Sequence, residues 1–520
     1  MRESRETKRM WMLGALAAVL LAGLLAAAPA HALTAAQCAA LTGLSVPSTT
    51  ITSATVVPAG GGLPEYCRVQ GHVDTEINFE LRLPTTTWNG KFYHEGGGGF
   101  VGSINPPGNG IRRGYAEVTT DTGHTGGAPA AALDGSWALN RPDRQVNFGH
   151  RGIHVVTVAA KQIVSGAYGR APSYSYFEGC SNGGRQAAME AQRYPTDFNG
   201  IVSGAPALDW VGLMTGFSWD EQALQAAPIP PAKLTVIANA VVDQCDAVDG
   251  LVDGLVDNPR RCHFDPSVLT CPAGDAPTCL TTAQVEALKK VYAGPTNSSG
   301  EQLHPGFPPG AEDGGDGWQL WISGPSVFGP PLQFTFEDQY MRYFVFGPSF
   351  NSLTFNFDTG PAALAASGEF LNATNPDLSA FHASGGKLIM WHGWADHALT
   401  ADRTIQYYDD VSRAMGNKNK ADEFFRLFLA PGMHHCGGGP GPNTLDALGA
   451  LESWVEGGIA PEAIIASHAT ATGTVDRTRP LCPYPAVAVY NGSGSVDDAR
   501  NFSCKERGLG YSLKGVQSGR

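Results

Sequence analysis

Short apolar runs alternate with amphipathic stretches in two separate parts of the chain. Runs rich in β-branched and aromatic residues predict strands over residues 91–95, 174–177, 200–207, 387–393 and 424–430. Apolar residues at helical spacing predict helices over residues 151–165, 185–195 and 401–415. Strands that alternate with helices form a parallel sheet covered on both faces, so we expect an α/β fold.

The alternation stops between its two parts, in a long region rich in Pro, Gly and Trp. Because the chain is longer than one compact core usually holds, we expect two domains. The first consists of residues 33–206 and 384–520, and the second is an insertion over residues 207–383.

The first 32 residues have the layout of a signal peptide. A charged start is followed by a long apolar run that ends in Ala30, His31 and Ala32. The run is nearly long enough to be a membrane anchor, but its Ala-rich composition and small-residue end favour cleavage after Ala32. No later stretch is apolar enough to span a bilayer, so we expect a secreted or periplasmic protein that leaves the membrane after cleavage.

The net charge of −13 argues against a nucleic-acid partner. Ten cysteines, an even number in a chain bound for an oxidising compartment, predict disulfides, the alternative being buried thiols or a metal site. Spacing alone does not fix the pairing, although three short spans favour local bridges: Cys245 to Cys262, Cys271 to Cys279, and Cys482 to Cys504.

One motif lies between a predicted strand and a predicted helix. Residues 179–183 read Gly-Cys-Ser-Asn-Gly, a G-x-S-x-G pattern, which in this context is typical of a nucleophile elbow. A turn that tight needs glycines, and it would present the Ser181 hydroxyl at the carboxyl end of the sheet. The backbone N–H of Asn182, at the helix start, is then a predicted oxyanion donor.

A serine nucleophile needs a histidine base and a carboxylate that orients it. In α/β-hydrolases these follow the serine in the order acid, then histidine. Asp396 follows the strand at 387–393, and His435 follows the strand at 424–430. Asp410, inside a predicted helix, and His434 are the competitors, and Asp396 could also be an ordinary turn residue.

Two cysteines favour His435 over His434. Cys180 immediately precedes Ser181, and Cys436 immediately follows His435. A bridge between them would hold the serine beside the histidine within hydrogen-bond reach.

The second oxyanion donor should come from a loop early in the sheet. Four glycines at 96–99 follow the strand at 91–95, and the backbone N–H of Gly98 or Gly99 would serve. A plain flexible turn is the alternative.

An acidic loop lies inside the insertion. Asp246, Asp249 and Asp253, with the main-chain carbonyls of Leu251 and Leu255, offer the hard oxygen ligands that calcium prefers. Cys245 and Cys262 flank the loop, although a solvated acidic loop without an ion is the alternative.

Taken together, the chain resembles the tannase and feruloyl esterase family, which also contains the hydrolase of mono(2-hydroxyethyl) terephthalate. The resemblance rests on Cys180-Ser181, Asp396 and His435-Cys436, on residues 179–207 and on the acidic loop. It implies an α/β-hydrolase catalytic domain, an inserted lid domain over 207–383 and a structural calcium ion in the lid, with no organic cofactor. It further implies five disulfide pairs: Cys38 with Cys67, Cys180 with Cys436, Cys245 with Cys262, Cys271 with Cys279, and Cys482 with Cys504.

We therefore expect a secreted serine esterase that hydrolyses esters of aromatic acids such as ferulate or gallate, free or attached to a plant polymer or polyphenol. The alternatives are a mono(2-hydroxyethyl) terephthalate-type hydrolase, a serine peptidase and a non-catalytic, calcium-stabilised binding protein. Several lid aromatics suit stacking on an aromatic acid, though most would equally suit a lid core: Trp318, Trp321, Phe328, Phe334, Tyr340, Tyr343 and Phe344. Arg342 could pair with a substrate carboxylate, but an arginine in an aromatic stretch is more often a surface or structural residue, so we do not assign it that role.

Overall fold

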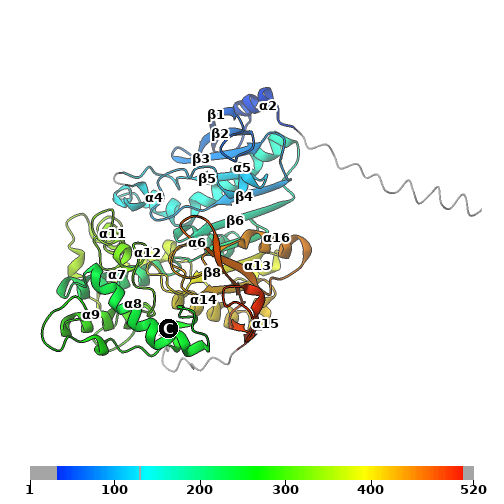
Figure 1. Ribbon diagram of the computed structural model, residues 1–520. Coiled ribbons are helices and arrows are strands. Elements are labelled where there is room, and N and C mark those ends of the chain that lie inside the picture. The colour runs from blue at the N-terminus through cyan, green and yellow to red at the C-terminus, as the bar shows by residue number, and fades with distance from the viewer. Residues whose placement is uncertain (1–31, 128–129, 507–520) are drawn as a thin grey trace, which may run out of the picture.

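The computed structural model describes residues 32–127 and 130–506 (Figure 1). The predicted signal peptide therefore lies outside the described residues, apart from Ala32. None of the described helices is both long and apolar enough to span a membrane.

A nine-stranded sheet forms the centre of the molecule, in the order β1-β2-β3-β5-β4-β6-β7-β8-β9. Its strands are β1 (Thr49–Val57), β2 (Tyr66–Val73), β3 (Ile77–Pro84), β4 (Lys91–Glu95), β5 (Ala116–Thr120), β6 (Tyr174–Cys180), β7 (Gly200–Gly204), β8 (Lys387–Gly393) and β9 (Phe425–Ala430). All five predicted strands are present, with β6 extended to the residue before Ser181.

The sheet is mixed rather than wholly parallel, which corrects the sequence-based expectation. The six strands from β5 to β9 run parallel, whereas β1, β2 and β3 pair antiparallel with one another and β3 pairs antiparallel with β5. The connections β1-β2 and β2-β3 are short, and a short connection can join only antiparallel neighbours, because parallel strands need a longer crossover.

Alternate residues of the parallel strands face two separate hydrophobic cores. Phe92, Phe177 and Leu388 face a core completed by α5 (Gly152–Tyr168), α6 (Asn182–Arg193) and α14 (Ala401–Ala414). Their neighbours Tyr93 and Tyr176 face a second core that contains α16 (Ala447–Gly457) and residues of β11 and β12. Both faces of the sheet are therefore covered, as the sequence predicts.

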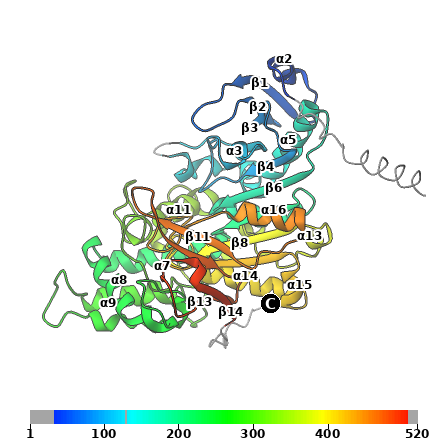
Figure 2. The ribbon, with the colours of Figure 1, turned by 45° about the vertical axis from the view of Figure 1, so that its right-hand side comes forward.

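Helices and loops, without a strand of the large sheet, occupy the segment between β7 and β8. Its helices are α7 (Trp210–Ala226), α8 (Pro231–Cys245), α9 (Thr282–Ala293), α10 (Trp318–Trp321), α11 (Leu332–Tyr340), α12 (Gly360–Leu371) and α13 (Ser379–Ala383). Most pack around a third core that includes Leu213, Ile237, Leu288 and Trp318. In Figures 1 and 2, α7, α8 and α9 lie together in green, beside the sheet.

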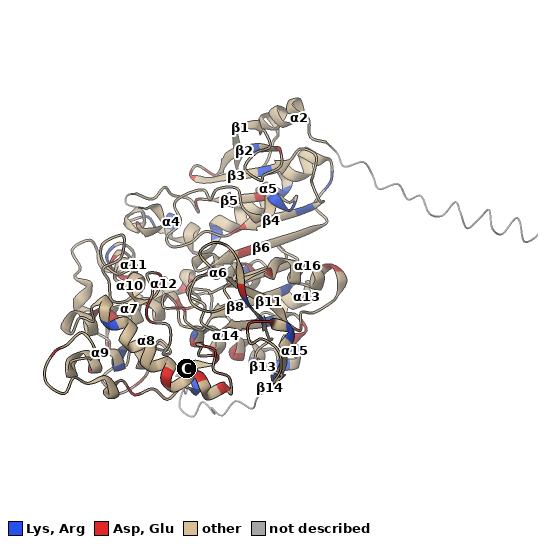
Figure 3. Ribbon diagram, in the orientation of Figure 1, with Lys and Arg blue, Asp and Glu red and all other residues tan. Residues whose placement is uncertain are grey.

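The remaining elements are short. They are α2 (Ala35–Ala40), α3 (Asn109–Arg112), α4 (Pro142–Val146), α15 (Lys418–Asp422), the sheet of β10 (Thr444–Leu445), β11 (Ile464–Ala469) and β12 (Val475–Leu481), and the hairpin of β13 (Ala486–Tyr490) and β14 (Phe502–Glu506). Figure 3 shows acidic and basic residues distributed over many of the elements rather than on one of them.

All ten cysteines are paired, as the sequence and the family resemblance predict. The five bonds join Cys38 to Cys67, Cys180 to Cys436, Cys245 to Cys262, Cys271 to Cys279, and Cys482 to Cys504.

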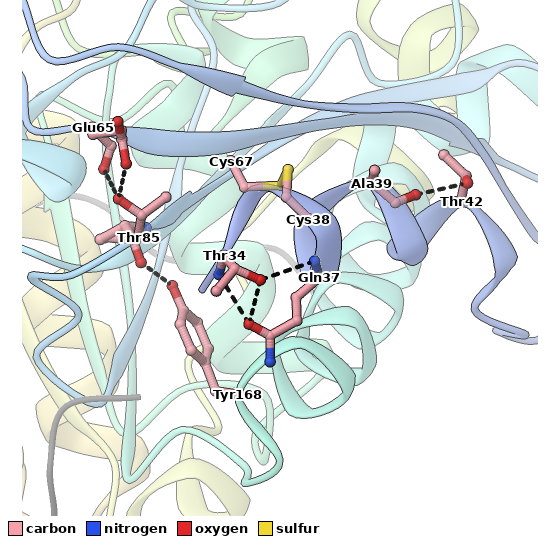
Figure 4. The surroundings of a disulfide bond; sticks show 10 residues. Thr34, Gln37, Cys38, Ala39, Thr42, Glu65, Cys67, Thr85 and Tyr168 are labelled. Carbon is pink, nitrogen blue, oxygen red and sulfur yellow. Dashed lines mark hydrogen bonds between the residues drawn. A yellow bond between two sulfur atoms is a disulfide. The ribbon is translucent and has the colours of Figure 1, made fainter. Parts of the chain in front are cut away.

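Two of these bonds fasten elements at the ends of the described chain. Figure 4 shows the bond from Cys38 on α2 to Cys67 on β2, beside the capping box that Thr34 forms at the start of α2. Near the other end, Cys482 directly follows β12 and is buried, whereas its partner Cys504 lies on β14 and is partly exposed. Outer elements too small for a core of their own are thus held covalently.

Candidate active site

Ser181 lies in the sharp turn between β6 and α6. Its backbone has φ 65° and ψ −126°, a conformation that non-glycine residues rarely adopt and that often marks functional sites. A Cβ atom on Gly179 would lie 2.6 Å from the carbonyl group of Gly183, and one on Gly184 would overlap the carbonyl oxygen of Gly204. Glycine is therefore required around the serine, and the predicted elbow is present.

The residues predicted to supply the oxyanion donors lie at the start of α6 and in the glycine loop after β4. Asn182 begins α6, and its side chain donates to the carbonyl of Gly97 at 3.0 Å, which ties the helix start to the glycine loop. Gly99 has φ +52°, and a Cβ there would overlap the carbonyl oxygen of Ala132. Gly99, Ser181 and Asn182 line one pocket, whereas Gly98 is exposed and is not among the residues that line it.

His435 and Asp396 are hydrogen-bonded. The distance from His435 Nδ1 to Asp396 Oδ2 is 2.7 Å, and the Asp396 side chain is fully buried while that of His435 is 8% exposed. His435 also lines the pocket of Ser181. The structure thus brings the three residues of the predicted triad to one site, in the arrangement in which a carboxylate orients an imidazole.

Two backbone N–H groups and two histidines surround the Asp396 carboxylate. Its Oδ1 accepts the N–H groups of Ala398 and Leu399 at 2.9 and 2.8 Å, and its Oδ2 faces His392 Nε2 at 3.2 Å as well as His435. Burial alone would raise the pKa of Asp396, but His435 and His392 outweigh burial and lower it below its ordinary value. Asp396 is therefore ionised under all ordinary conditions.

His392 is a site residue that the sequence reasoning missed. It is fully buried on β8, and its Nδ1 lies 2.8 Å from the hydroxyl of Thr404 on α14. The sequence feature that could have identified it is its position: His392 lies near the end of the strand that precedes Asp396, four residues before that aspartate.

The disulfide between Cys180 and Cys436 joins the elbow to the histidine loop, with a Cα–Cα distance of 6.0 Å. Cys436 has a positive φ of 61°, so the loop turns sharply directly after His435.

The two competing residues face elsewhere. His434 Nε2 lies 3.1 Å from the carbonyl of Ala311, and its Nδ1 lies 3.2 Å from the carboxylate of Asp316, both in the inserted segment. Asp410 pairs with Arg413 at the surface of α14. Neither competitor lines the pocket of Ser181.

The pocket at Ser181 encloses about 330 Å³, which includes space open to solvent, and its walls are mostly apolar. Besides Gly99, Ser181, Asn182 and His435, it is lined by Ala207, Trp210, Leu213, Met214, Phe217, Trp321, Phe336, Ala398 and Leu399. The Trp321 ring lies edge-on to His435, with ring centroids 5.0 Å apart. Among the described residues that line the pocket, none is Lys or Arg.

Trp321 is the one lid aromatic among those singled out from the sequence that lines this pocket. Trp318 and Tyr340 are fully buried in the core of the inserted segment, and Phe344 packs against that core. Phe328 is 47% exposed. The last two, Phe334 and Tyr343, are partly exposed and do not line the pocket either.

Arg342 is engaged away from the pocket. It donates to the carbonyl of Pro348 and pairs with Asp338 at 3.1 Å.

Four residues of α7 line the pocket and were missed by the sequence reasoning: Trp210, Leu213, Met214 and Phe217. A helix buried on several sides has no distinct binding face in the sequence, so no pattern marked them.

The acidic loop follows α8 directly. Asp246 accepts the backbone N–H groups of Asp253 and Gly254, and Asp253 pairs with the buried Arg479 at 2.6 Å. Burial raises the pKa of Asp249, and the negative charges of Asp253 and Asp246 add to the rise. This donor chemistry fits calcium. Within the described residues, however, their oxygen atoms are not gathered within 4.8 Å of one another.

Comparisons with known proteins identify the family of this chain. Residues 62–505 match the family model "Tannase and feruloyl esterase". An uncharacterised esterase from Xanthomonas campestris pv. campestris is 39% identical over 92% of each chain. The mono(2-hydroxyethyl) terephthalate hydrolase of Piscinibacter sakaiensis is 35% identical over 87% of each chain. The solved structure of feruloyl esterase B from Aspergillus oryzae superposes with a TM-score of 0.81 at 27% identity, covering 91% of this chain and 100% of that one. This chain is a carboxylic ester hydrolase with an α/β fold, and it belongs to the tannase and feruloyl esterase family.

Proposed function

We propose that the protein is a secreted serine esterase that cleaves esters of aromatic acids through an acyl-enzyme. The aromatic acyl group of the proposed substrate carries no charge. The observation that carries the proposal is the shared pocket: Gly99, Ser181, Asn182 and His435 line one apolar pocket, and Asp396 is hydrogen-bonded to the histidine.

In the proposed mechanism, His435 takes the proton of the Ser181 hydroxyl while the serine oxygen attacks the ester carbonyl carbon. The backbone N–H groups of Asn182 and Gly99 stabilise the oxyanion that forms. His435 then returns the proton to the alcohol as the ester C–O bond breaks. Water, activated by the same histidine, hydrolyses the acyl-enzyme and restores Ser181. Asp396 stays ionised throughout and orients the imidazole.

The lining of the pocket supports a neutral acyl group. Aromatic and aliphatic side chains of α7, α10 and α11 surround it, which suits an aromatic ring, and a buried carboxylate would need a cationic partner. A terephthalate half-ester, with its free carboxylate, is the second candidate, because a relative that is 35% identical bears the name of such a hydrolase. Arg342, already paired with Asp338, does not line the pocket.

The test combines labelling with substrate comparison. A fluorophosphonate probe should label the wild type, and Ser181→Ala should abolish both labelling and hydrolysis while leaving the circular-dichroism spectrum unchanged. Methyl ferulate and methyl gallate should be cleaved faster than mono(2-hydroxyethyl) terephthalate, and the corresponding anilides, which a peptidase would cleave, should not be. Full activity in Ser181→Ala would refute the mechanism, and a preference for the terephthalate half-ester would refute the substrate class alone.

Two further parts of the proposal concern the whole protein. The carboxylates of Asp246, Asp249 and Asp253 and the carbonyls of Leu251 and Leu255 would hold calcium, which would supply a fixed positive charge that tightens the loop. Five disulfides suit an oxidising compartment, in support of export. N-terminal sequencing of exported protein should show cleavage after Ala32, and an uncleaved chain would refute the signal peptide.

A further inference from the structure

We propose that His154, Glu190 and Asp197 form a second metal site, which binds a divalent transition-metal ion such as Zn²⁺. One ligand atom from each residue lies within 4.8 Å of the other two. His154 comes from α5, Glu190 from α6, and Asp197 from the loop between α6 and β7. The site is separate from the acidic loop and from the pocket of Ser181.

Glu190 supplies the strongest support. Its side chain is 1% exposed, yet neither of its carboxylate oxygens is paired with a hydrogen-bond donor among the described residues. The group that faces it is the carboxylate of Asp197, which adds negative charge. A carboxylate without a donor in the interior costs several kcal/mol unless a cation or a proton compensates its charge. A metal ion between Glu190 and Asp197 would supply that compensation.

The histidine is already in position to act as a ligand. Its Nδ1 lies 2.6 Å from Asp197 Oδ2, and its ring stacks on Tyr194 at a centroid distance of 3.9 Å and an angle of 4°. With metal–ligand bonds of about 2 Å, an ion that replaces the proton between these two atoms would move them apart, to more than about 3 Å, and the ring proton would be carried on Nε2 instead. One imidazole and two carboxylates form a ligand set that zinc and its neighbours favour over calcium.

Solvent can reach the cluster from one side. The His154 side chain is 31% exposed and that of Asp197 is 12% exposed. An ion could thus enter from solvent and keep a water molecule as a fourth ligand.

Nearby cations limit the affinity. Lys161 of α5 interacts with both carboxylates and donates to the backbone carbonyl of Asp197, while burial lowers its pKa. His150 contacts the hydroxyl of Tyr194, and Arg193 donates to the carbonyl of Glu369. Burial lowers the pKa of His150 to about 4, so His150 is neutral near pH 7. Lys161, which interacts with both carboxylates, repels a metal cation, so we expect moderate affinity for a divalent ion.

The position of Glu190 indicates a structural role. It lies nine residues after Ser181 on the same helix, which corresponds to roughly 13 Å along the axis. The helix α6 begins at the turn that contains Ser181. The ion would link the other end of α6 to α5 and to the loop that follows α6.

The test is a Co²⁺ titration of the full-length protein after chelator treatment, because Co²⁺ bound by histidine and carboxylates absorbs visible light. We expect one equivalent to bind, Zn²⁺ to displace it, and both ions to raise the melting temperature. Glu190→Gln and His154→Ala should each weaken binding at least tenfold. Glu462→Gln changes an exposed carboxylate outside both proposed metal sites, so it is the control and should bind as the wild type does.

Three results would overturn the proposal. The first is the absence of stoichiometric binding in the wild type. The second is equal binding in wild type and His154→Ala, because removal of a ligand must weaken binding at the proposed site. The third is a Glu190→Gln variant that melts at a higher temperature than the wild type, when the wild type itself binds no metal ion. Burial and the nearby Asp197 raise the pKa of Glu190 well above its ordinary value, so that result would show a proton in place of the ion.

Discussion

Cys180 and Cys436 are joined in a disulfide, and each of them adjoins a residue of the candidate triad. Ser181 follows the first cysteine and His435 precedes the second, while the two residues come from turns at the ends of different strands, β6 and β9. The bond therefore fixes the position of Ser181 relative to His435, the candidate nucleophile and base. Without it, their relative position would depend on hydrogen bonds and on the packing of the two loops.

Breaking this bond should impair catalysis more than folding. We expect Cys180→Ala with Cys436→Ala to reduce kcat/KM by about 10²-fold, because displacements near 1 Å cost that much in a positioned site. The matched control is Cys271→Ala with Cys279→Ala, which removes a bond between lid residues eight positions apart. Ester hydrolysis and circular dichroism should be measured on both pairs. Equal activity losses in the two variants would contradict a positioning role.

Glu95 should make the protein less stable as the pH rises. Burial raises the pKa of Glu95 from 4.5 to about 7, and the neighbouring Glu117 adds to the rise. The folded state therefore retains a proton that the unfolded state has lost, so stability falls between pH 4.5 and about pH 7. The loss should be on the order of 3 kcal/mol.

Replacing Glu95 with Gln tests this directly. Glu95→Gln should unfold at higher urea concentration than the wild type at pH 8, and the difference should vanish at pH 4.5. Glu462→Gln changes an exposed carboxylate and serves as the control. If Glu95→Gln raised the urea concentration of unfolding equally at both pH values, the charge of the Glu95 carboxylate would not be the cause.

Calcium should stabilise the lid if the acidic loop binds it. Addition of EGTA should lower the melting temperature, since an ion at a hundred times its dissociation constant contributes about 2.7 kcal/mol. Asp249→Asn should remove this response, whereas Glu190→Gln, outside the loop, should keep it. A wild type whose melting temperature is the same with calcium and with EGTA would refute the calcium proposal.

Local patterns predicted those parts of the fold and site that depend on neighbouring residues. The strand-turn-helix around Ser181 and the acid and histidine loops follow from short-range spacing, and the cysteines beside Ser181 and His435 added a covalent constraint. The antiparallel strands β1, β2 and β3 were not predicted. Burial is irregular along β1 and nearly continuous along β3, whereas β2 alternates regularly from Cys67 to Val73.

Residues that depend on tertiary packing were not predictable in the same way. His392 contacts Asp396 only because β8 and the following loop fold back together, and Phe336 reaches the pocket through the placement of α11. The cluster of His154, Glu190 and Asp197 combines two helices and a loop, and nothing in its spacing distinguishes it from ordinary polar residues of a helix surface.

Trp321 should contribute to recognition of the acyl ring. It lies edge-on to His435 and stacks on Phe336 at a centroid distance of 6.3 Å, so it forms an aromatic wall beside the base. Trp321→Ala should raise KM for methyl ferulate roughly fivefold, since an aromatic contact contributes about 1 kcal/mol beyond burial. The effect on methyl butyrate, which has no ring, should be smaller. Phe328→Ala removes an exposed lid aromatic outside the pocket and should leave both substrates unaffected. If Trp321→Ala lowered kcat equally for the two esters and left KM unchanged, the indole would be a support for His435 and not a contact for the acyl group.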